Sequence, residues 1–245
     1  AIIAVYAAAG FVLLRGVVAP QFVKLEQDSA RNDLAQAENM LEREVLSVSA
    51  YGSDYARWDD TYRFLNTHDR QYIESNYSYD SMKAQNMDFA CIIDLNGRIV
   101  FSEAYASDGS VIPVDDFDKM GTALARLVSR GVSDTVSVWS GFIRTSRGLM
   151  ITASYPVVDS KISLPSRGRL VVGRFFDDAE QAHLRDILKA DVVFSAVSES
   201  SDAKDAVERV QTSEDGTALV LTHIVPDVFG SPVAEMRLRY PKTVS

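Results

Sequence analysis

The sequence has little cysteine and little histidine. Its 245 residues contain one cysteine, Cys91, so no disulfide can form within the chain. The histidines stand far apart, and none has a cysteine or a second histidine at the spacing of a metal-binding motif. We therefore expect no metal site in this chain.

Motifs for catalysis and cofactor binding are also missing. The sequence has no G-x-x-x-x-G-K-[ST], G-x-G-x-x-G, H-E-x-x-H or G-x-S-x-G stretch. The pairs Asp115-Asp116 and Asp177-Asp178 precede helical segments, where helix capping explains them. Adjacent helical residues point about 100° apart, so such pairs do not form the facing carboxylates of a glycosidase. We predict that this chain has no catalytic residues and no cofactor.

Basic residues are outnumbered. The chain has 25 Lys and Arg residues against 34 Asp and Glu residues, a net charge of −9. This balance argues against a nucleic-acid partner, which would select a basic face. Hydrophobic residues make up 47% of the chain, enough for the core of one large domain or two small ones.

The longest uncharged run lies at the start. Residues 1–14 carry no charge, and as a helix they would rise about 21 Å, less than the roughly 30 Å of a membrane core. The run is either the outer end of a transmembrane helix or the apolar core of a signal peptide. We favour a membrane helix ending within residues 1–19, because a helix-compatible segment follows with little interruption.

That following segment predicts one long helix over residues 20–66. Its apolar residues recur every seven positions in two series, Leu34, Leu41, Val48, Tyr55, Tyr62 and Ala37, Tyr51, Trp58, Leu65, the second of which is interrupted by Glu44. A repeat of 3.5 residues per turn indicates a narrow apolar stripe that needs a partner. The partner is a second copy, the rest of the domain, or both in succession. We predict that the part from Leu34 to Val48 forms the seam of a homodimer.

An antiparallel sheet is predicted next. Asn96-Gly97 joins two β-rich runs, 89–93 and 99–105, as a hairpin. Asp115 or Asp116 would cap a helix over 117–129. Three further strands are expected at 135–143, 149–157 and 169–176. This order favours a sheet with helices on one side, as in PAS-like modules.

The last third predicts a smaller unit. A helix over 177–189 precedes four short β-rich runs, 192–197, 207–211, 218–224 and 233–240. They form a second α/β unit or extend the first sheet. We therefore predict an α+β fold in four segments: 1–19 (membrane), 20–66 (signalling helix), 67–176 (PAS/Cache-like sensory module with flanking helices) and 177–245 (smaller membrane-proximal unit).

The stretch "DYARWDDTYRFL", residues 54–65, mixes aromatic rings with carboxylates. Adjacent aspartates are poor residues for the interior of a helix. They lie either on a solvated face, with Asp59 pairing with Arg63, or where the helix packs on the sheet. In the second case we expect Trp58 and Tyr62 to be buried, and at least one aspartate to bond to a neighbouring loop such as 76–81.

This stretch resembles the hallmark of the CHASE class-four family of extracellular sensory domains, of the Cache/PAS-like superfamily. The pattern D-x-A-x-W-D-D-x-Y-x-F is matched by Asp54, Ala56, Trp58, Asp59, Asp60, Tyr62 and Phe64. The hairpin "IIDLNGRIVFS", the strand pair "VSVWSGFIRTSRGLMITASYPVV" and "GRLVVGRFFD" are also similar to the family, and the resemblance covers residues 22–244.

The resemblance implies a sensory domain between two transmembrane helices of the inner membrane, facing the periplasm or cell exterior. It implies a cytoplasmic output, often a GGDEF or EAL domain that makes or degrades cyclic di-GMP, sometimes a histidine kinase or chemoreceptor module. Neither string occurs in this chain. The ligands of the family are mostly unknown, so the resemblance supplies none.

We therefore predict a dimeric ligand-sensing domain of a receptor that controls cyclic di-GMP. Alternatives are the sensor of a histidine kinase or chemoreceptor, a domain that binds a periplasmic protein or sets dimer geometry without a small ligand, and a secreted solute-binding protein. Residues that alternate on strands beside an expected cavity are the candidate pocket: Trp139, Met150, Thr152, Ser154 and Arg174. Arg174 would bind an anionic ligand through its fork of donors.

Overall fold

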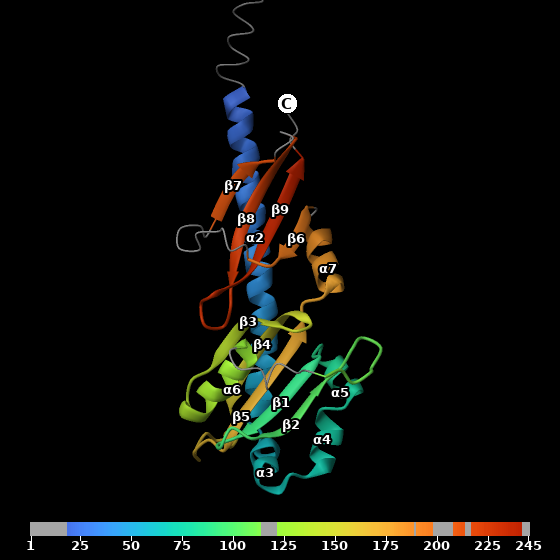
Figure 1. Ribbon diagram of the computed structural model, residues 1–245, viewed down its shortest axis with the longest axis vertical. Coiled ribbons are helices and arrows are strands. Elements are labelled where there is room, and N and C mark those ends of the chain that lie inside the picture. Colours follow the sequence, from blue (N-terminus) through green and yellow to red (C-terminus); the bar gives the residue numbers. More distant parts are fainter. Residues whose placement is uncertain (1–18, 114–121, 189, 198–207, 214–216, 242–245) are drawn as a thin grey trace, which may run out of the picture. The chain divides into compact units, whose positions relative to one another are not determined.

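The computed structural model describes residues 19–113, 122–188, 190–197, 208–213 and 217–241 (Figure 1). The predicted membrane segment therefore lies outside the described residues, except for Ala19, where the first described helix begins. Among the helices of the described residues, none is both long enough and apolar enough to cross a membrane.

The fold is α+β, and its contacts divide it into two units. The larger unit contains residues 41–180 and 225–233, and the smaller unit contains 1–40, 181–224 and 234–245. The division differs from the predicted segments at two places. The long N-terminal helix contributes to both units, and residues 225–233 return to the larger one.

The predicted helix over 20–66 is two helices. Helix α2 spans Ala19–Ala56 and α3 spans Asp59–Thr67. Between them Trp58 has extended backbone angles, φ −86° and ψ 137°, as the residue that precedes α3. The prediction of one continuous helix was wrong, and Asp59-Asp60 lies in the first turn of α3. Carboxylates are favourable there because they face the positive end of the helix dipole.

The apolar stripe of α2 is buried within a single chain. Leu34, Ala37, Leu41 and Val48 are all buried, with at most 5% of their surface exposed. The predicted dimer seam at these residues is therefore wrong, because they have no surface left for a second copy.

The second half of α2 packs directly on the sheet of the larger unit. A Cβ atom built on Gly52 would lie 3.0 Å from Val172 Cγ2 and 3.5 Å from Ala153 Cβ, so the helix backbone approaches the strands closely. Three residues earlier, Ser49 Oγ shares a 2.7 Å hydrogen bond with the hydroxyl of Tyr155. Glycine at position 52 allows this approach, since a side chain would push the helix away.

The sheet of the larger unit has five antiparallel strands in the order β2-β1-β5-β4-β3. The strands are β1 Phe89–Asp94, β2 Ile99–Ala104, β3 Trp139–Thr145, β4 Gly148–Pro156 and β5 Gly168–Phe175. The predicted hairpin is confirmed, since β1 pairs with β2 and Gly97 has a φ of 80°. The third strand begins at Trp139, four residues later than predicted.

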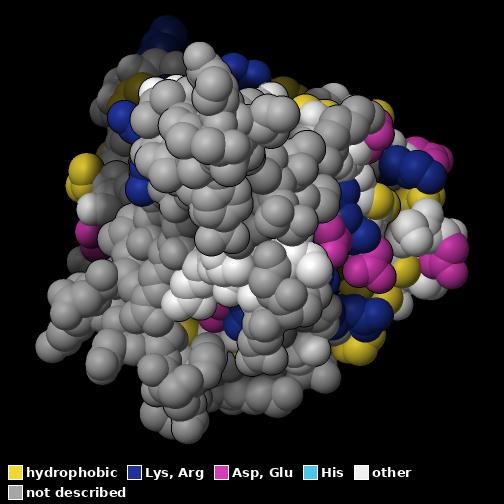
Figure 2. All heavy atoms as spheres, turned by 90° about the horizontal axis from the view of Figure 1, so that it is seen from above, with side chains coloured by type: hydrophobic (Ala, Val, Ile, Leu, Met, Phe, Trp, Pro, Cys, Tyr) yellow, Lys and Arg dark blue, Asp and Glu magenta, His cyan; other side chains and the backbone are white. Residues whose placement is uncertain are grey.

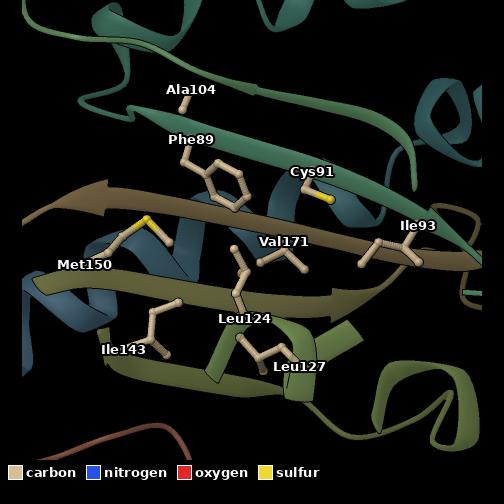
Figure 3. Packing of buried hydrophobic residues seen from close by; sticks show 9 residues of the cluster. All are labelled: Phe89, Cys91, Ile93, Ala104, Leu124, Leu127, Ile143, Met150 and Val171. Carbon is tan, nitrogen blue, oxygen red and sulfur yellow. The ribbon is translucent and has the colours of Figure 1, made fainter. Parts of the chain in front are cut away.

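Helices cover both faces of this sheet. Leu124 and Leu127 of α6 (Ala123–Ser133) share a core cluster with Met150 and Val171 (Figure 3). Ala153 of β4 and Val172 of β5 face α2 instead, because successive residues of a strand point to opposite faces of the sheet. The prediction of helices on one side was therefore wrong. Thr122 Oγ1 caps α6, accepting from Ala125 N at 3.1 Å, while Asp115, Asp116 and residues 117–121 lie outside the described residues.

Two short helices follow α3. They are α4, Arg70–Asn76, and α5, Tyr79–Ala84. Asp69 caps α4 by accepting a hydrogen bond from Gln71 N at 3.0 Å.

The last third contains α7, Asp178–Leu188, and a second sheet in the order β6-β9-β8-β7. The strands are β6 Asp191–Ser195, β7 Glu208–Thr212, β8 Ala218–Pro226 and β9 Pro232–Pro241. The turn between β8 and β9 belongs to the larger unit, where Val228 N donates to Phe142 O at 3.0 Å.

Candidate functional site

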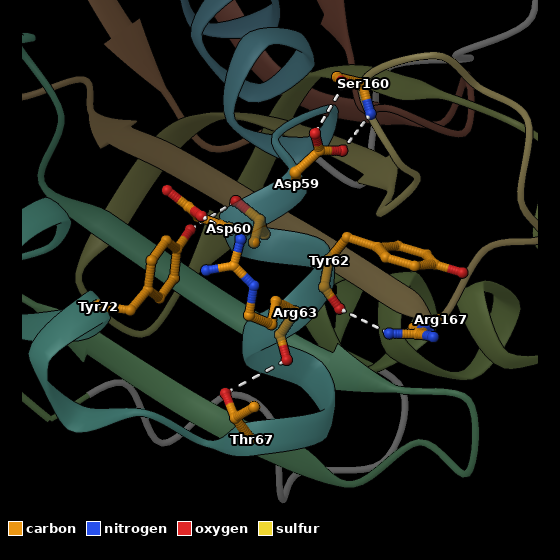
Figure 4. Close-up of polar contacts among 9 residues, drawn as sticks. Asp59, Asp60, Tyr62, Arg63, Thr67, Tyr72, Ser160 and Arg167 are labelled. Carbon is orange, nitrogen blue, oxygen red and sulfur yellow. Dashed lines mark hydrogen bonds and ion pairs between the residues drawn. The ribbon is translucent and has the colours of Figure 1, made fainter.

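In the stretch of residues 54–65, here called the Trp-Asp-Asp stretch, the first of the two adjacent aspartates binds a loop that is far away in the sequence. Asp59 accepts hydrogen bonds from Ser160 N at 2.9 Å and from Ser160 Oγ at 3.0 Å (Figure 4). The prediction that an aspartate binds a loop is confirmed, although the loop precedes β5 and is not 76–81. Asp60 pairs with Arg63 at 3.0 Å, three residues on, so Arg63 forms its ion pair with Asp60 and not with Asp59, as the solvated-face alternative proposed.

The aromatic residues of the stretch divide into buried and exposed. Tyr62 is buried, and its hydroxyl donates to Pro165 O at 3.1 Å while the Arg167 guanidinium lies 3.9 Å from its ring centre. Trp58 is 40% exposed, so the prediction that it is buried was wrong. Tyr62 therefore anchors α3 to the loop before β5, and Trp58 does not.

Thr61 ties the two helices together across their break. Its side chain is fully buried, and its Oγ1 donates to Tyr55 O at 2.6 Å. The same hydroxyl shares a hydrogen bond with the hydroxyl of Tyr72 on α4. The bond from Thr61 Oγ1 to Tyr55 O satisfies a carbonyl in the last turn of α2, which the interruption of the helix leaves without its usual partner.

The predicted pocket residues do not share one face of the sheet. Met150, Thr152 and Ser154 alternate on β4 toward α6, and Arg174 points to the face of α2. Thr152 Oγ1 donates to Val172 O at 2.8 Å, and Met150 lies in the core cluster. Met150, Thr152, Ser154 and Arg174 are buried, and the fifth predicted residue, Trp139, is half-buried. Their role as ligand contacts remains a prediction.

Arg169 is absent from the predicted pocket residues, yet it has the most polar contacts on the face of the sheet that α6 covers. It is 2% exposed. Its guanidinium donates to Ser154 Oγ at 3.0 Å, Asp134 O at 2.9 Å and Ser137 O at 2.6 Å, and it lies 4.3 Å from the Trp139 ring centre. Burial lowers the pKa of Arg169 to about 10, so it stays charged at neutral pH. The available signal was a charged residue inside the β-rich run "GRLVVG".

Arg174 connects β5 to α2 on the other face. It is 4% exposed and forms ion pairs with Glu44 of α2 and, at 3.6 Å, with Glu180 of α7. Two carboxylates therefore already meet its charge. Its predicted role toward an anionic ligand remains a prediction, and such a ligand would have to displace at least one of them.

Two clefts lie beside the helix break. One of about 710 Å³ is lined by residues that include Tyr51, Asp54 and Trp58, and one of about 260 Å³ lies between α3 and α4. Where side chains of described residues are visible in Figure 2, acidic and basic groups lie next to one another. Within the described ranges, no group of three His, Cys, Asp or Glu residues is placed to hold a metal ion.

The family membership of the chain is shown by a match over most of its length. The family profile of the CHASE4 domain matches residues 40–195, which is more than half of the 245 residues. The chain belongs to the CHASE4 family. The match includes the Trp-Asp-Asp stretch, the whole five-stranded sheet of this CHASE4 domain and its α6.

A curated relative of this CHASE4 domain is the methanogenesis regulatory histidine kinase FilI of Methanothrix harundinacea (strain 6Ac). It is 25% identical over 215 residues, covering 83% of this chain but 23% of FilI. The chain thus spans about a quarter of the length of this relative.

Solved structures share the fold. The extracellular domain of vpHK1S-Z8, assigned as a histidine kinase, has a TM-score of 0.61 at 11% identity, over 91% of this chain and 93% of that one. The ligand-binding domain of the Campylobacter jejuni chemoreceptor Tlp3, in complex with L-valine, has a TM-score of 0.50 at 12% identity, over 94% and 96% of the two chains. These neighbours are sensor domains, as the predicted PAS/Cache-like α+β fold implies.

Asp88 gives the CHASE4 domain a predicted pH signature. Burial raises the pKa of Asp88, and the nearby charges of Asp177 and Glu180 add to the effect. The folded state therefore binds this proton more tightly than the unfolded chain, and stability falls as pH rises through the raised pKa. Asp88→Asn is expected to raise Tm at pH 7, and the gain should vanish below about pH 4, where both states are protonated.

Asp134 is a control whose pKa is shifted in the opposite direction from that of Asp88. Hydrogen bonds from Ser137 and from Val136 N lower the pKa of Asp134 to about 2. Its charge therefore stabilises the fold at neutral pH, and this stability is lost as pH falls from about 4 through 2. Asp134→Asn should lower Tm at pH 7. Thermal unfolding that shifts in the same direction for both variants would contradict the assignment.

Proposed function

We propose that this chain is the extracytoplasmic sensor domain of a membrane-bound histidine kinase. Membership of the CHASE4 family and the histidine kinase FilI, 25% identical over 83% of the chain, support this proposal. A cyclic di-GMP output, the main expectation from the sequence, has less support because this relative is a kinase. A chemoreceptor output remains the second candidate, favoured by the shared fold with Tlp3.

The observation that carries the proposal is the packing of α2 on the sensory sheet. One continuous helix contacts the sheet through Gly52, Ser49 and the Glu44–Arg174 ion pair. A ligand that binds one arrangement of sheet and helix more tightly shifts the population toward it. A helix displacement of about 1–2 Å is typical of such switches. We propose that α2 carries this displacement toward a membrane span in the predicted segment 1–19.

The ligand contacts are part of the proposal. Trp139 and Ser154 meet Arg169 beneath α6, and Met150 and Thr152 lie on the same face. A small molecule that reached this group would have to move α6 or the segment whose carbonyls Arg169 holds. Arg174 would act on the opposite face, by exchanging Glu44 for a ligand. An unidentified periplasmic protein as ligand, and a homodimer that uses a surface other than the buried stripe, are the alternatives for partners.

The test uses the complete gene product in membrane vesicles. Labelled ATP tests for autophosphorylation on histidine, and GTP tests for synthesis of cyclic di-GMP. The proposal predicts phosphohistidine and no cyclic di-GMP. Cyclic di-GMP synthesis without phosphorylation would replace the kinase with the other output.

A further inference from the structure

We propose that the cleft where α2 meets α3 binds a small molecule through an ammonium group. The cleft of about 710 Å³ is lined by Tyr51, Asp54, Tyr55 and Trp58 among others. Small-molecule sites have volumes of about 300–1,000 Å³. The inference concerns binding alone, so it does not depend on which output the receptor has.

Trp58 is placed where neither core packing nor helix capping accounts for it. It precedes α3 as the capping residue, yet an indole has no oxygen to accept a hydrogen bond from the helix N-terminus. Tyr55 stacks on it at 4.3 Å between ring centres, with an angle of 24° between the planes. Because Trp58 is still 40% exposed and lines the cleft, it presents open aromatic surface there.

Asp54 is also unfavourable for its own helix. It lies in the last turn of α2, where the negative end of the helix dipole repels a carboxylate. Its side chain is exposed on the cleft and has no ion-pair partner within the part of the chain that the structure describes. A carboxylate kept here without a partner is available to a cation.

Tyr51 adds a buried hydroxyl without a partner. The residue is 7% exposed, and its hydroxyl lies near Tyr55 but has no hydrogen bond of normal geometry among the described residues. Its ring lies 4.3 Å from that of Tyr55, which continues the stack toward Trp58. A buried polar group without a partner destabilises the free protein, and a ligand atom in the cleft would satisfy it.

Together these groups match an ammonium ligand. Aromatic faces attract cations through the negative charge of the π-system, and a nearby carboxylate neutralises the charge. Arg57 lines the same cleft. The ligand is therefore either a simple organic cation or a zwitterion whose carboxylate meets Arg57, and both share the ammonium group.

Isothermal titration calorimetry on the intact chain tests the proposal with three probes. These are choline, glycine betaine and the uncharged 3,3-dimethylbutan-1-ol, which has the same shape without the charge. We expect choline or betaine to bind with Kd of about 1 mM or tighter, and the alcohol at least about tenfold more weakly. No binding of either charged probe at about 10 mM, or equal binding of the alcohol, would overturn the proposal.

Substitutions in the cleft test whether the probe binds there, and they distinguish a simple organic cation from a zwitterion as the ligand. Trp58→Ala and Asp54→Asn should each weaken the charged probe at least about tenfold, while Glu42→Gln, exposed on the same helix, should not. Arg57→Gln should weaken betaine if the site takes zwitterions and leave choline unchanged. Unchanged affinity in Trp58→Ala would overturn the site. Both Trp58 and Asp54 are exposed, so these variants are expected to fold.

Tyr51→Phe is expected to raise the stability of the free chain and to lower its affinity for the charged probe. Removing the hydroxyl that lacks a partner should raise Tm of the free chain. The same change should weaken the charged probe, because the ligand loses a hydrogen bond. A lower Tm combined with unchanged affinity would contradict the role given to this hydroxyl.

Discussion

Arg169→Met is expected to lower the free energy of unfolding by about 3 kcal/mol or more. The guanidinium is buried and serves the carbonyls of Asp134, Ser137 and Ser154 at 2.6–3.0 Å. Methionine fills part of the volume but donates nothing, so these acceptors lose their partner. Each buried polar group left without a hydrogen bond costs about 1–3 kcal/mol. Urea denaturation of the purified chain measures the loss.

Two further variants make this result specific. Arg169→Lys keeps the charge but replaces a planar fork with a single ammonium, so its loss should be intermediate. Arg98→Met, at an exposed position, should change the stability by no more than about 0.5 kcal/mol. Equal losses for Arg169→Met and Arg98→Met would show that the buried network does not hold the segment before β3 on the sheet.

Gly168→Ala is expected to cost about 3 kcal/mol, at the upper end for overpacking. A Cβ atom at this position would lie 2.1 Å from Ile93 O and 3.0 Å from Leu65 Cδ1. The carbonyl belongs to the paired strand β1 and cannot turn away, so the strands would have to separate. Thermal unfolding followed by circular dichroism gives the change in Tm.

The matched control is Ser140→Ala, which places the same residue at an exposed position of β3. Its effect on the free energy of unfolding should stay within about 0.5 kcal/mol. If Gly168→Ala were as mild as this control, β1 and β5 would not approach as closely as the structure shows.

The sheet could be predicted from the sequence because its signals are local. The hairpin needs only two β-rich runs and the positive φ that Gly97 supplies between them. The helix break could not be predicted from periodicity, because Tyr55, Tyr62 and Leu65 keep the seven-residue spacing across it. The signal for the break was Asp59-Asp60, which suits the first turn of a new helix.

The candidate site depended on facts that one sequence does not contain. Alternation places Thr152 and Ser154 on one face of β4, but the pairing with β5 needs the strand register. In that register Thr152 pairs with Gly173, so Arg174 falls on the other face. Likewise, the stripe of α2 shows that a partner exists but not that the partner is the chain itself. Burial within one chain decided this point.

The central claim is that the contact between α2 and the sheet sets the output of the receptor. Positions 52 and 153 allow a direct test, because their Cβ atoms would lie 3.5 Å apart, within the range of a disulfide. The double variant Gly52→Cys/Ala153→Cys would link helix to strand on oxidation. Cys91 is buried and would not compete. The single variants serve as controls for the substitutions themselves.

The decisive measurement is autophosphorylation of the full-length double variant in membrane vesicles, oxidised and then reduced, with the crosslink verified by gel mobility. We expect oxidation to fix autophosphorylation of the double variant at one level and reduction to return it to the range of the Gly52→Cys single variant, while neither single variant responds to oxidation. A fully crosslinked receptor with the autophosphorylation of its reduced form would contradict the claim that this contact carries the signal.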